Sequence, residues 1–307
     1  MATVFVTRAF PFDALERLAA HHQVDVWDDT APPPRDAFKQ RAARADALLT
    51  MLTERVDADL FDAAPSVRAV ANMAVGTDNI DLEEAARRNI KVGNTPGVLT
   101  DATADIAFAL LLAIARRIVD GDHEVRAGRW VPWYPTHMIG GDVSGTTLGI
   151  VGWGRIGQAM ARRAEGFGMR VIHSSRSSGI PLDDLLEQAD HVSLHTPLTP
   201  ETRHLIGPRE LARMKPTAYL INTARGPVVD QAALREALIA KRIAGAALDV
   251  TDPEPLPAGD PLLDAPNLLV VPHVGSATIR TRTRMADMAV ENLLAALADR
   301  PMPHPAT

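Results

Sequence analysis

Apolar residues along the first third of the chain alternate between two spacings. Short runs of β-branched and apolar residues, typical of buried strands, are followed by segments in which apolar residues recur every three or four positions, as on one face of a helix. The expected strands are Thr3–Thr7, Val24–Trp27, Ala47–Met51 and Val67–Asn72, and the expected helices are Asp13–His21, Arg35–Arg44, Asp57–Ala63 and Leu82–Asn89. This alternation predicts a parallel sheet covered by helices on both faces.

The same alternation returns after a helical stretch, Asp101–Gly128, and an aromatic loop, Arg129–Gly145. The strands expected there are Thr147–Gly152, Arg170–His173, His191–His195, Ala218–Asn222, Ala244–Asp249 and Leu268–Val271. We expect the last, amphipathic helix, Ser276–Ala298, to pack back on the N-terminal sheet. The predicted fold class is α/β with two doubly wound parallel-sheet domains. Residues 1–98 and 279–307 would form a flavodoxin-like domain, and residues 99–278 a Rossmann-type domain with a helical arm.

Composition narrows the possible functions. The chain has 307 residues, of which 32 are basic and 38 acidic, for a formal net charge of −6, and it has no Lys/Arg-rich run. We therefore expect no nucleic-acid partner, because phosphate neutralisation needs clustered positive charge. The absence of cysteine excludes disulfides, thiolate metal sites and cysteine nucleophiles. The longest apolar stretch, Ile106–Ile114, is too short to cross a bilayer, so we expect a cytoplasmic protein without a membrane partner.

A glycine-rich loop follows the first strand of the second series. The sequence LGIVGWGRIGQAM places Gly152, Gly154 and Gly157 in the spacing of a dinucleotide-binding loop, with Arg155 and Ile156 between them. The first glycine of such a loop makes a tight turn, the second lets a diphosphate approach the backbone, and the third allows the helix to pack on the strand. The alternative is a βα turn without a ligand. In context, the motif predicts that residues 99–278 bind a nicotinamide dinucleotide.

The end of the next strand bears on which dinucleotide is preferred. An NAD site typically has a carboxylate there, about 20 residues past the glycines. This chain has Ser174, Ser175 and Arg176 instead, and a guanidinium suits a 2′-phosphate. We therefore predict NADP(H) as the preferred coenzyme, with NAD(H) possible. Alternatively, this segment is a polar loop with a solvated arginine.

Three ionisable residues follow the carboxyl ends of later strands, where open α/β sheets bind ligands. They are Arg225 in YLINTARGP, Glu254 in LDVTDPEPLP and His273 in VVPHVGSAT. An arginine can bind a carboxylate and polarise a neighbouring carbonyl. A histidine can protonate the alkoxide formed by hydride transfer, and a neighbouring glutamate would favour its charged form. Taken one at a time, each could instead be an ordinary surface or structural residue.

Together these motifs resemble the D-2-hydroxyacid dehydrogenases over essentially the whole chain, and within them most closely the glyoxylate/hydroxypyruvate reductases. The resemblance implies that Arg225, Glu254 and His273 are the catalytic residues. It also implies that Leu52 and the backbone amides of Val75 and Gly76 bind substrate, together with Arg225 and His273. Further cofactor contacts are implied at Thr103, Thr196, Pro197, Thr223, Ala224, Asp249 and Gly275.

The helical arm resembles the family's dimerisation element, and this resemblance implies a homodimer. Trp133 would then either pack in the interface or reach the neighbouring subunit's active site and limit substrate size. The predicted function is NADPH-preferring reduction of glyoxylate and hydroxypyruvate, with histidine as proton donor and no metal. The alternatives are a dehydrogenase for a larger 2-oxo acid, for formate or for phosphite, and a dinucleotide-sensing regulator.

Overall fold

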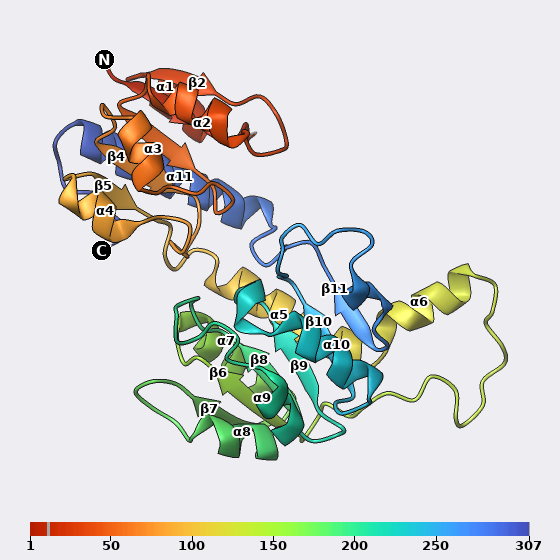
Figure 1. Ribbon diagram of the computed structural model, residues 1–307. Helices are drawn as coiled ribbons and strands as arrows, with labels where there is room; N and C mark the ends of the chain where they lie inside the picture. Colours follow the sequence, from red (N-terminus) through yellow and green to blue (C-terminus); the bar gives the residue numbers. More distant parts are fainter. Residues whose placement is uncertain (11–12, 307) are drawn as a thin grey trace. The chain divides into compact units, whose positions relative to one another are not determined.

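The computed structural model describes residues 1–10 and 13–306, which form two compact units. One unit combines Met1–Leu99 with the C-terminal segment from Ala277 onward, and the other is Thr100–Ser276. Both are built on parallel sheets with helices on either face (Figure 1). The predicted fold class, two doubly wound parallel sheets, is confirmed.

The first unit contains a five-stranded sheet in the order β2-β1-β3-β4-β5, the flavodoxin-like order. Its strands are β1 (Thr3–Val6), β2 (Gln23–Val26), β3 (Ala47–Thr50), β4 (Ala69–Asn72) and β5 (Lys91–Gly93). One face packs against α1 (Ala14–Ala19) and the long helix α11 (Ile279–Leu297). The other face packs against α2 (Arg35–Ala42), α3 (Ala58–Ala63) and α4 (Leu82–Arg87). Each face therefore has its own apolar core.

The second unit contains a six-stranded sheet in the order β11-β10-β9-β8-β6-β7. Its strands are β6 (Thr147–Val151), β7 (Arg170–Ser174), β8 (His191–Leu194), β9 (Tyr219–Asn222), β10 (Gly245–Leu248) and β11 (Leu268–Val270). Helices α5 (Thr100–Ala115) and α7 (Arg155–Glu165) cover one face. Helices α8 (Leu182–Gln188), α9 (Pro208–Arg213) and α10 (Gln231–Ile239) cover the other. The strand order reverses between β6 and β8, and open sheets bind ligands at such a point.

The structure differs from the sequence-based expectation in two elements. The helical stretch expected over Asp101–Gly128 is divided at Arg117, whose φ of 54° ends α5 and starts a separate helix, α6 (Ile118–Arg126). Helix α5 buries one side against the sheet, whereas α6 has no buried residue. Strand β5 was not predicted, because three residues are too few to show a periodic pattern.

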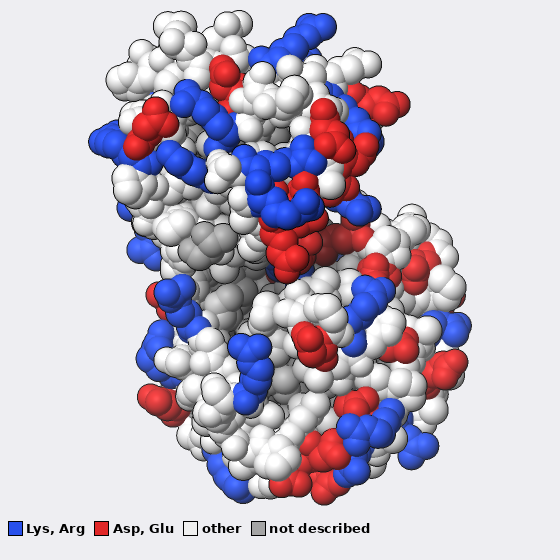
Figure 2. All heavy atoms as spheres, turned by 60° about the vertical axis from the view of Figure 1, so that its left-hand side comes forward, with Lys and Arg blue, Asp and Glu red and all other residues white. Residues whose placement is uncertain are grey.

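The arm formed by α6 and the following loop, 118–139, exposes large apolar side chains. They are Ile118, Val125, Trp130, Val131, Trp133, Tyr134 and Ile139. Elsewhere, acidic and basic side chains are interspersed over both units on the face drawn in Figure 2. No helix in the described part of the chain is both long and apolar enough to cross a membrane.

Candidate active site

Two of the predicted catalytic residues form a hydrogen-bonded pair beyond the carboxyl ends of β10 and β11. Nδ1 of His273 lies 2.5 Å from Oε1 of Glu254. A carboxylate can only accept a hydrogen bond, so Nδ1 carries the proton of this contact and Nε2 is left for another partner. The backbone N–H of His273 donates to the carbonyl of Asp249, which holds the imidazole loop against the end of β10. The arrangement suits proton transfer at Nε2.

Arg225 lies in the turn that follows β9. The side chain of Asn222 shapes this turn, because its Nδ2 donates to the carbonyl of Arg225 over 2.9 Å and its Oδ1 accepts from the N–H of Ala224 over 3.0 Å. A Cβ added at Gly226 would lie 1.9 Å from the carbonyl oxygen of Thr251. The loop after β9 therefore packs directly on the loop after β10 that leads to Glu254. Sequence reasoning missed Gly226, although its place directly after the arginine was a signal.

The glycine-rich loop has the geometry that its spacing predicts. Gly152 has a φ of +98°, and a Cβ there would lie 2.5 Å from the carbonyl oxygen of His195. A Cβ at Gly157 would lie 2.2 Å from the carbonyl oxygen of Gly152, so the first turn of α7 packs tightly on the loop. A Cβ at Gly154, at the N-terminus of α7, would meet no atom within 4 Å. Protein contacts explain the first and third glycines, and a bound diphosphate would explain the second.

Several buried polar atoms in and beside the sheet that carries this loop have no hydrogen-bond partner within residues 1–10 and 13–306. They are Oγ1 of Thr196, Oγ1 of Thr223, Nδ1 of His195 and Nε2 of His173. Thr196 and His195 follow β8, and Thr223 follows β9, so three of the four lie at the carboxyl edge of the sheet. Buried polar groups are nearly always hydrogen-bonded. With open space at Gly154, these atoms fit a site built for a polar dinucleotide.

Asp249, at the end of β10, has a second role that sequence reasoning missed. Its Oδ1 accepts from the N–H of Val274 over 2.6 Å and its Oδ2 from the N–H of Gly275 over 2.9 Å. Burial raises its pKa, against the hydrogen bonds from these amides and the charge of His273. Thr103 of α5 donates to the carbonyl of Gly275. The expected cofactor contact at Asp249 would therefore add to an existing role in holding the turn after His273.

The segment after β7 forms a tight turn. Oγ of Ser175 accepts from the N–H of Ser178 and contacts the Ser178 carbonyl, and Ser174 pairs with Gly179 in an isolated bridge. The Ser175 hydroxyl is thus already used within the turn, while Arg176 is exposed. The pKa of Glu201 is lowered mainly by a hydrogen bond from Thr199 and to a lesser degree by the charge of Arg176. Glu201 is therefore a carboxylate within electrostatic range of Arg176.

The expected substrate residues of the first unit lie at the carboxyl ends of neighbouring strands. Leu52 follows β3, and Val75 and Gly76 follow β4. The carbonyl of Val75 accepts from Asn94 Nδ2 over 2.8 Å, and that of Gly76 accepts from the side chain of Asn72 over 3.0 Å. The two carbonyls of this turn are therefore held in place, which fixes the peptide groups that carry the amides of Gly76 and Thr77.

The family of the chain is shown by its similarity to known proteins. Residues 108–275 match the family described as D-isomer specific 2-hydroxyacid dehydrogenase, NAD binding domain. The match covers more than half of the chain. The chain belongs to the D-isomer-specific 2-hydroxyacid dehydrogenases. It is therefore an oxidoreductase that binds a nicotinamide dinucleotide.

Individual proteins resemble the chain over nearly its whole length. A glyoxylate reductase of Korarchaeum cryptofilum is 53% identical over 304 residues, which cover 95% of this chain and 92% of that protein. The crystal structure of a Thermus thermophilus protein, 48% identical, has a TM-score of 0.95 and covers 99% of this chain and 100% of its own. An NADPH-dependent glyoxylate/hydroxypyruvate reductase of Sinorhizobium meliloti, solved in complex with NADP and malonate, is 34% identical to the chain. Its TM-score is 0.84, and the match covers 99% of this chain and 96% of that protein.

Proposed function

We propose that this dehydrogenase reduces small 2-oxo acids, glyoxylate to glycolate and hydroxypyruvate to D-glycerate, and prefers NADPH. The observation that carries the proposal is the contact of 2.5 Å between His273 and Glu254 beside the loop of Arg225. The glyoxylate reductase that is 53% identical to the chain supports the substrate class. The Sinorhizobium enzyme, an NADPH-dependent reductase, supports the coenzyme.

The proposed roles follow from the chemistry of a 2-oxo acid. When bound, the reduced nicotinamide supplies a hydride to the carbonyl carbon. Arg225 binds the carboxylate and polarises the neighbouring carbonyl oxygen. His273 donates the proton of Nε2 to that oxygen as negative charge develops on it, and in the oxidative direction it accepts the proton back. Glu254 accepts from Nδ1 and holds the ring in the required orientation.

The remaining predicted contacts are part of the same proposal. The backbone amides of Val75 and Gly76, beside Leu52, bind the substrate carboxylate as an anion nest. Gly152, Gly154, Arg155, Ile156 and Gly157 hold the diphosphate. Thr103, Thr196, Pro197, Thr223, Ala224, Asp249 and Gly275 surround the rest of the coenzyme. Ser174 and Arg176 bind the 2′-phosphate, while Ser175 acts by shaping the turn.

We also propose that two copies associate through the arm. Helix α6 borders a groove of its own unit that is lined in part by Ile114, Val119, Ile139, Tyr219 and Leu268. Exposed aromatic side chains such as Trp130 and Trp133, which are 74% and 85% exposed, are typical of interface cores. Sedimentation velocity tests this part, because a monomer at micromolar concentration would contradict it.

The activity is tested by following coenzyme oxidation in the near ultraviolet with glyoxylate, hydroxypyruvate and phenylpyruvate, each with NADPH and with NADH. We expect faster turnover of NADPH with the two small acids. A preference for NADH would overturn the coenzyme assignment alone, and turnover of phenylpyruvate alone would overturn the substrate class. Absence of turnover with every pair would favour a regulator that senses dinucleotides.

A further inference from the structure

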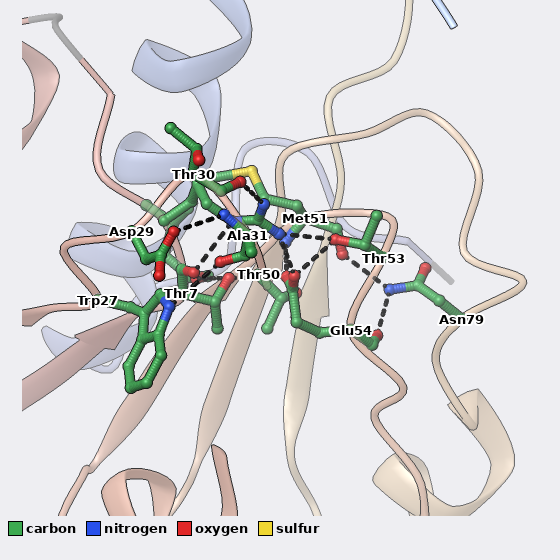
Figure 3. Close-up of polar contacts among 12 residues, drawn as sticks. Thr7, Trp27, Asp29, Thr30, Ala31, Thr50, Met51, Thr53, Glu54 and Asn79 are labelled. Carbon is green, nitrogen blue, oxygen red and sulfur yellow. Dashed lines mark hydrogen bonds and ion pairs between the residues drawn. The ribbon is translucent and has the colours of Figure 1, made fainter. Parts of the chain in front are cut away.

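A buried carboxylate, that of Glu54, lies in the loop after β3, two residues past Leu52 (Figure 3). Glu54 is 3% exposed and accepts four hydrogen bonds. Its Oε1 accepts from Arg8 Nη2 over 2.8 Å and from Thr53 Oγ1 over 2.6 Å. Its Oε2 accepts from Thr7 Oγ1 over 2.7 Å and from the N–H of Met51 over 2.6 Å. The carboxylate thus joins the end of β1 to the loop after β3.

The number of donors indicates that this site is built around a negative charge. A buried carboxylate is costly unless it is paired and fully hydrogen-bonded, and here each oxygen has two donors. Arg8 supplies the opposite charge, and its Nη1 donates to the carbonyl of Thr30 over 2.5 Å, which ties in a third loop. A neutral side chain at position 54 could not accept all of these hydrogen bonds with the same strength.

A second set of hydrogen bonds connects the loop of Glu54 to the turn after β4. Nδ2 of Asn79 donates to the carbonyls of Met51 and Glu54, over 3.0 and 2.9 Å. Its Oδ1 accepts from Nδ2 of Asn72, which also donates to the carbonyl of Gly76. The side chains of Asn79 and Asn72 therefore link the backbone carbonyl of Glu54 to the carbonyl of Gly76 in the turn after β4. Figure 3 shows Asn79 reaching the loop of Met51 and Glu54.

We propose that Glu54 is a positioning residue for the substrate carboxylate. Through Met51 it sets the place of Leu52, and through Asn79 and Asn72 it holds the carbonyl of Gly76, which adjoins the amides of Val75 and Gly76 in the same turn. The role rests on the proposed function, since it presumes that these amides bind the 2-oxo acid. Leu52 and Gly76 lie beyond the last paired residues of β3 and β4, and a displacement of about 1 Å at a binding group can cost about a hundredfold in rate.

The test compares Glu54→Gln with Glu84→Gln in the full-length enzyme. Glu84 is a matched control, because it is in the same unit, is also 3% exposed and accepts a hydrogen bond from an arginine, Arg88, at Oε1. It differs from Glu54 in lying on helix α4 and not in the loop after β3. For Glu54→Gln we expect KM for glyoxylate to rise about tenfold, kcat to fall less than about threefold and the Kd of NADPH to stay unchanged. For Glu84→Gln we expect unchanged KM and kcat, whatever its melting temperature.

The outcomes separate this inference from the proposed function. If the unaltered enzyme reduces no 2-oxo acid, the proposed function fails before any variant is compared. If the unaltered enzyme is active but Glu54→Gln keeps the normal KM, or changes KM no more than Glu84→Gln does, the positioning role is overturned. If Glu54→Gln does not fold, Thr53→Val decides, because Thr53 is exposed and its loss removes one donor from Oε1. A rise in KM of about threefold at normal kcat supports the role, and an unchanged KM overturns it.

Discussion

His273 and Glu254 are 19 residues apart in the chain, yet Nδ1 of the imidazole lies 2.5 Å from Oε1 of the carboxylate. They meet because β10 and β11 are adjacent parallel strands, so that the loops beyond their carboxyl ends share one edge of the sheet. The contact assigns the hydrogen to Nδ1 and turns Nε2 away from Glu254. Its consequences can be tested by altering one partner at a time.

Replacing Glu254 by glutamine keeps the size of the side chain but removes its charge. We expect kcat for glyoxylate to fall about a hundredfold, within the range typical of general acid–base catalysis, because the imidazolium loses its counter-charge. The Kd of the coenzyme should not change. Glu187→Gln, which alters the exposed ion pair between Glu187 on α8 and Arg213 on α9, should have normal kinetics. Normal turnover by Glu254→Gln would remove this residue from the mechanism.

Replacing Arg225 by alanine removes the proposed donor to the substrate carbonyl. We expect a loss of about 3 kcal/mol in transition-state stabilisation, measured from kcat/KM. The loss should appear with every 2-oxo acid tested. Arg235→Ala is a suitable control, because Arg235 lies on α10 and donates to the carbonyl of Pro261. Similar kinetics of the two variants would contradict the role of Arg225.

Two glycines of the nucleotide loop should respond differently to alanine. A Cβ at Gly154 meets no protein atom, so Gly154→Ala should melt at the normal temperature but bind coenzyme at least about tenfold more weakly. A Cβ at Gly157 collides with the backbone carbonyl of Gly152, so Gly157→Ala should lower the melting temperature without any ligand. Calorimetry and fluorescence titration measure the two effects. Normal coenzyme binding by Gly154→Ala would argue against a diphosphate at this position.

The coenzyme preference should depend on Arg176. We expect Arg176→Ala to raise the KM for NADPH about tenfold and to leave that for NADH nearly unchanged, because only NADPH carries the 2′-phosphate. Arg170→Ala provides the control, since Arg170 is exposed at the opposite end of β7. Equal effects of Arg176→Ala on both coenzymes would mean that this arginine does not bind the 2′-phosphate.

Stability should fall as the pH is lowered toward 4. Burial lowers the pKa of His195 to about 4 in the folded protein, whereas an unfolded histidine titrates near pH 6.5. Between these values the unfolded chain binds more protons, so the free energy of unfolding should drop by about 2 kcal/mol between pH 7 and pH 5. Urea unfolding of the coenzyme-free protein measures this. His195→Gln should show a smaller drop, with a remainder from His191 and His22, whose pKa values burial also lowers. An equal drop in both proteins would contradict the assignment.

Local sequence determined the elements and the family. Periodic apolar positions predicted both parallel sheets, and the glycine spacing predicted a nucleotide loop whose backbone matches it at Gly152 and Gly157. These features could be predicted because each depends on residues close together in the chain. The end of α5 at Arg117 and the strand β5 were missed, because a single left-handed residue and a run of three residues produce no periodic signal.

Tertiary structure alone decided how residues from different loops combine. The pairing of Asp249 with the amides of Val274 and Gly275, and the four donors around Glu54, join segments that no sequence pattern links. Glu54 looks like an ordinary loop glutamate in the sequence, and only the packing of β1 beside β3 makes it a buried hydrogen-bond acceptor. The sequence determined which chemical groups the protein has at its strand ends. Strand order determined which of them meet, because adjacent parallel strands bring their carboxyl-end loops to the same edge of a sheet.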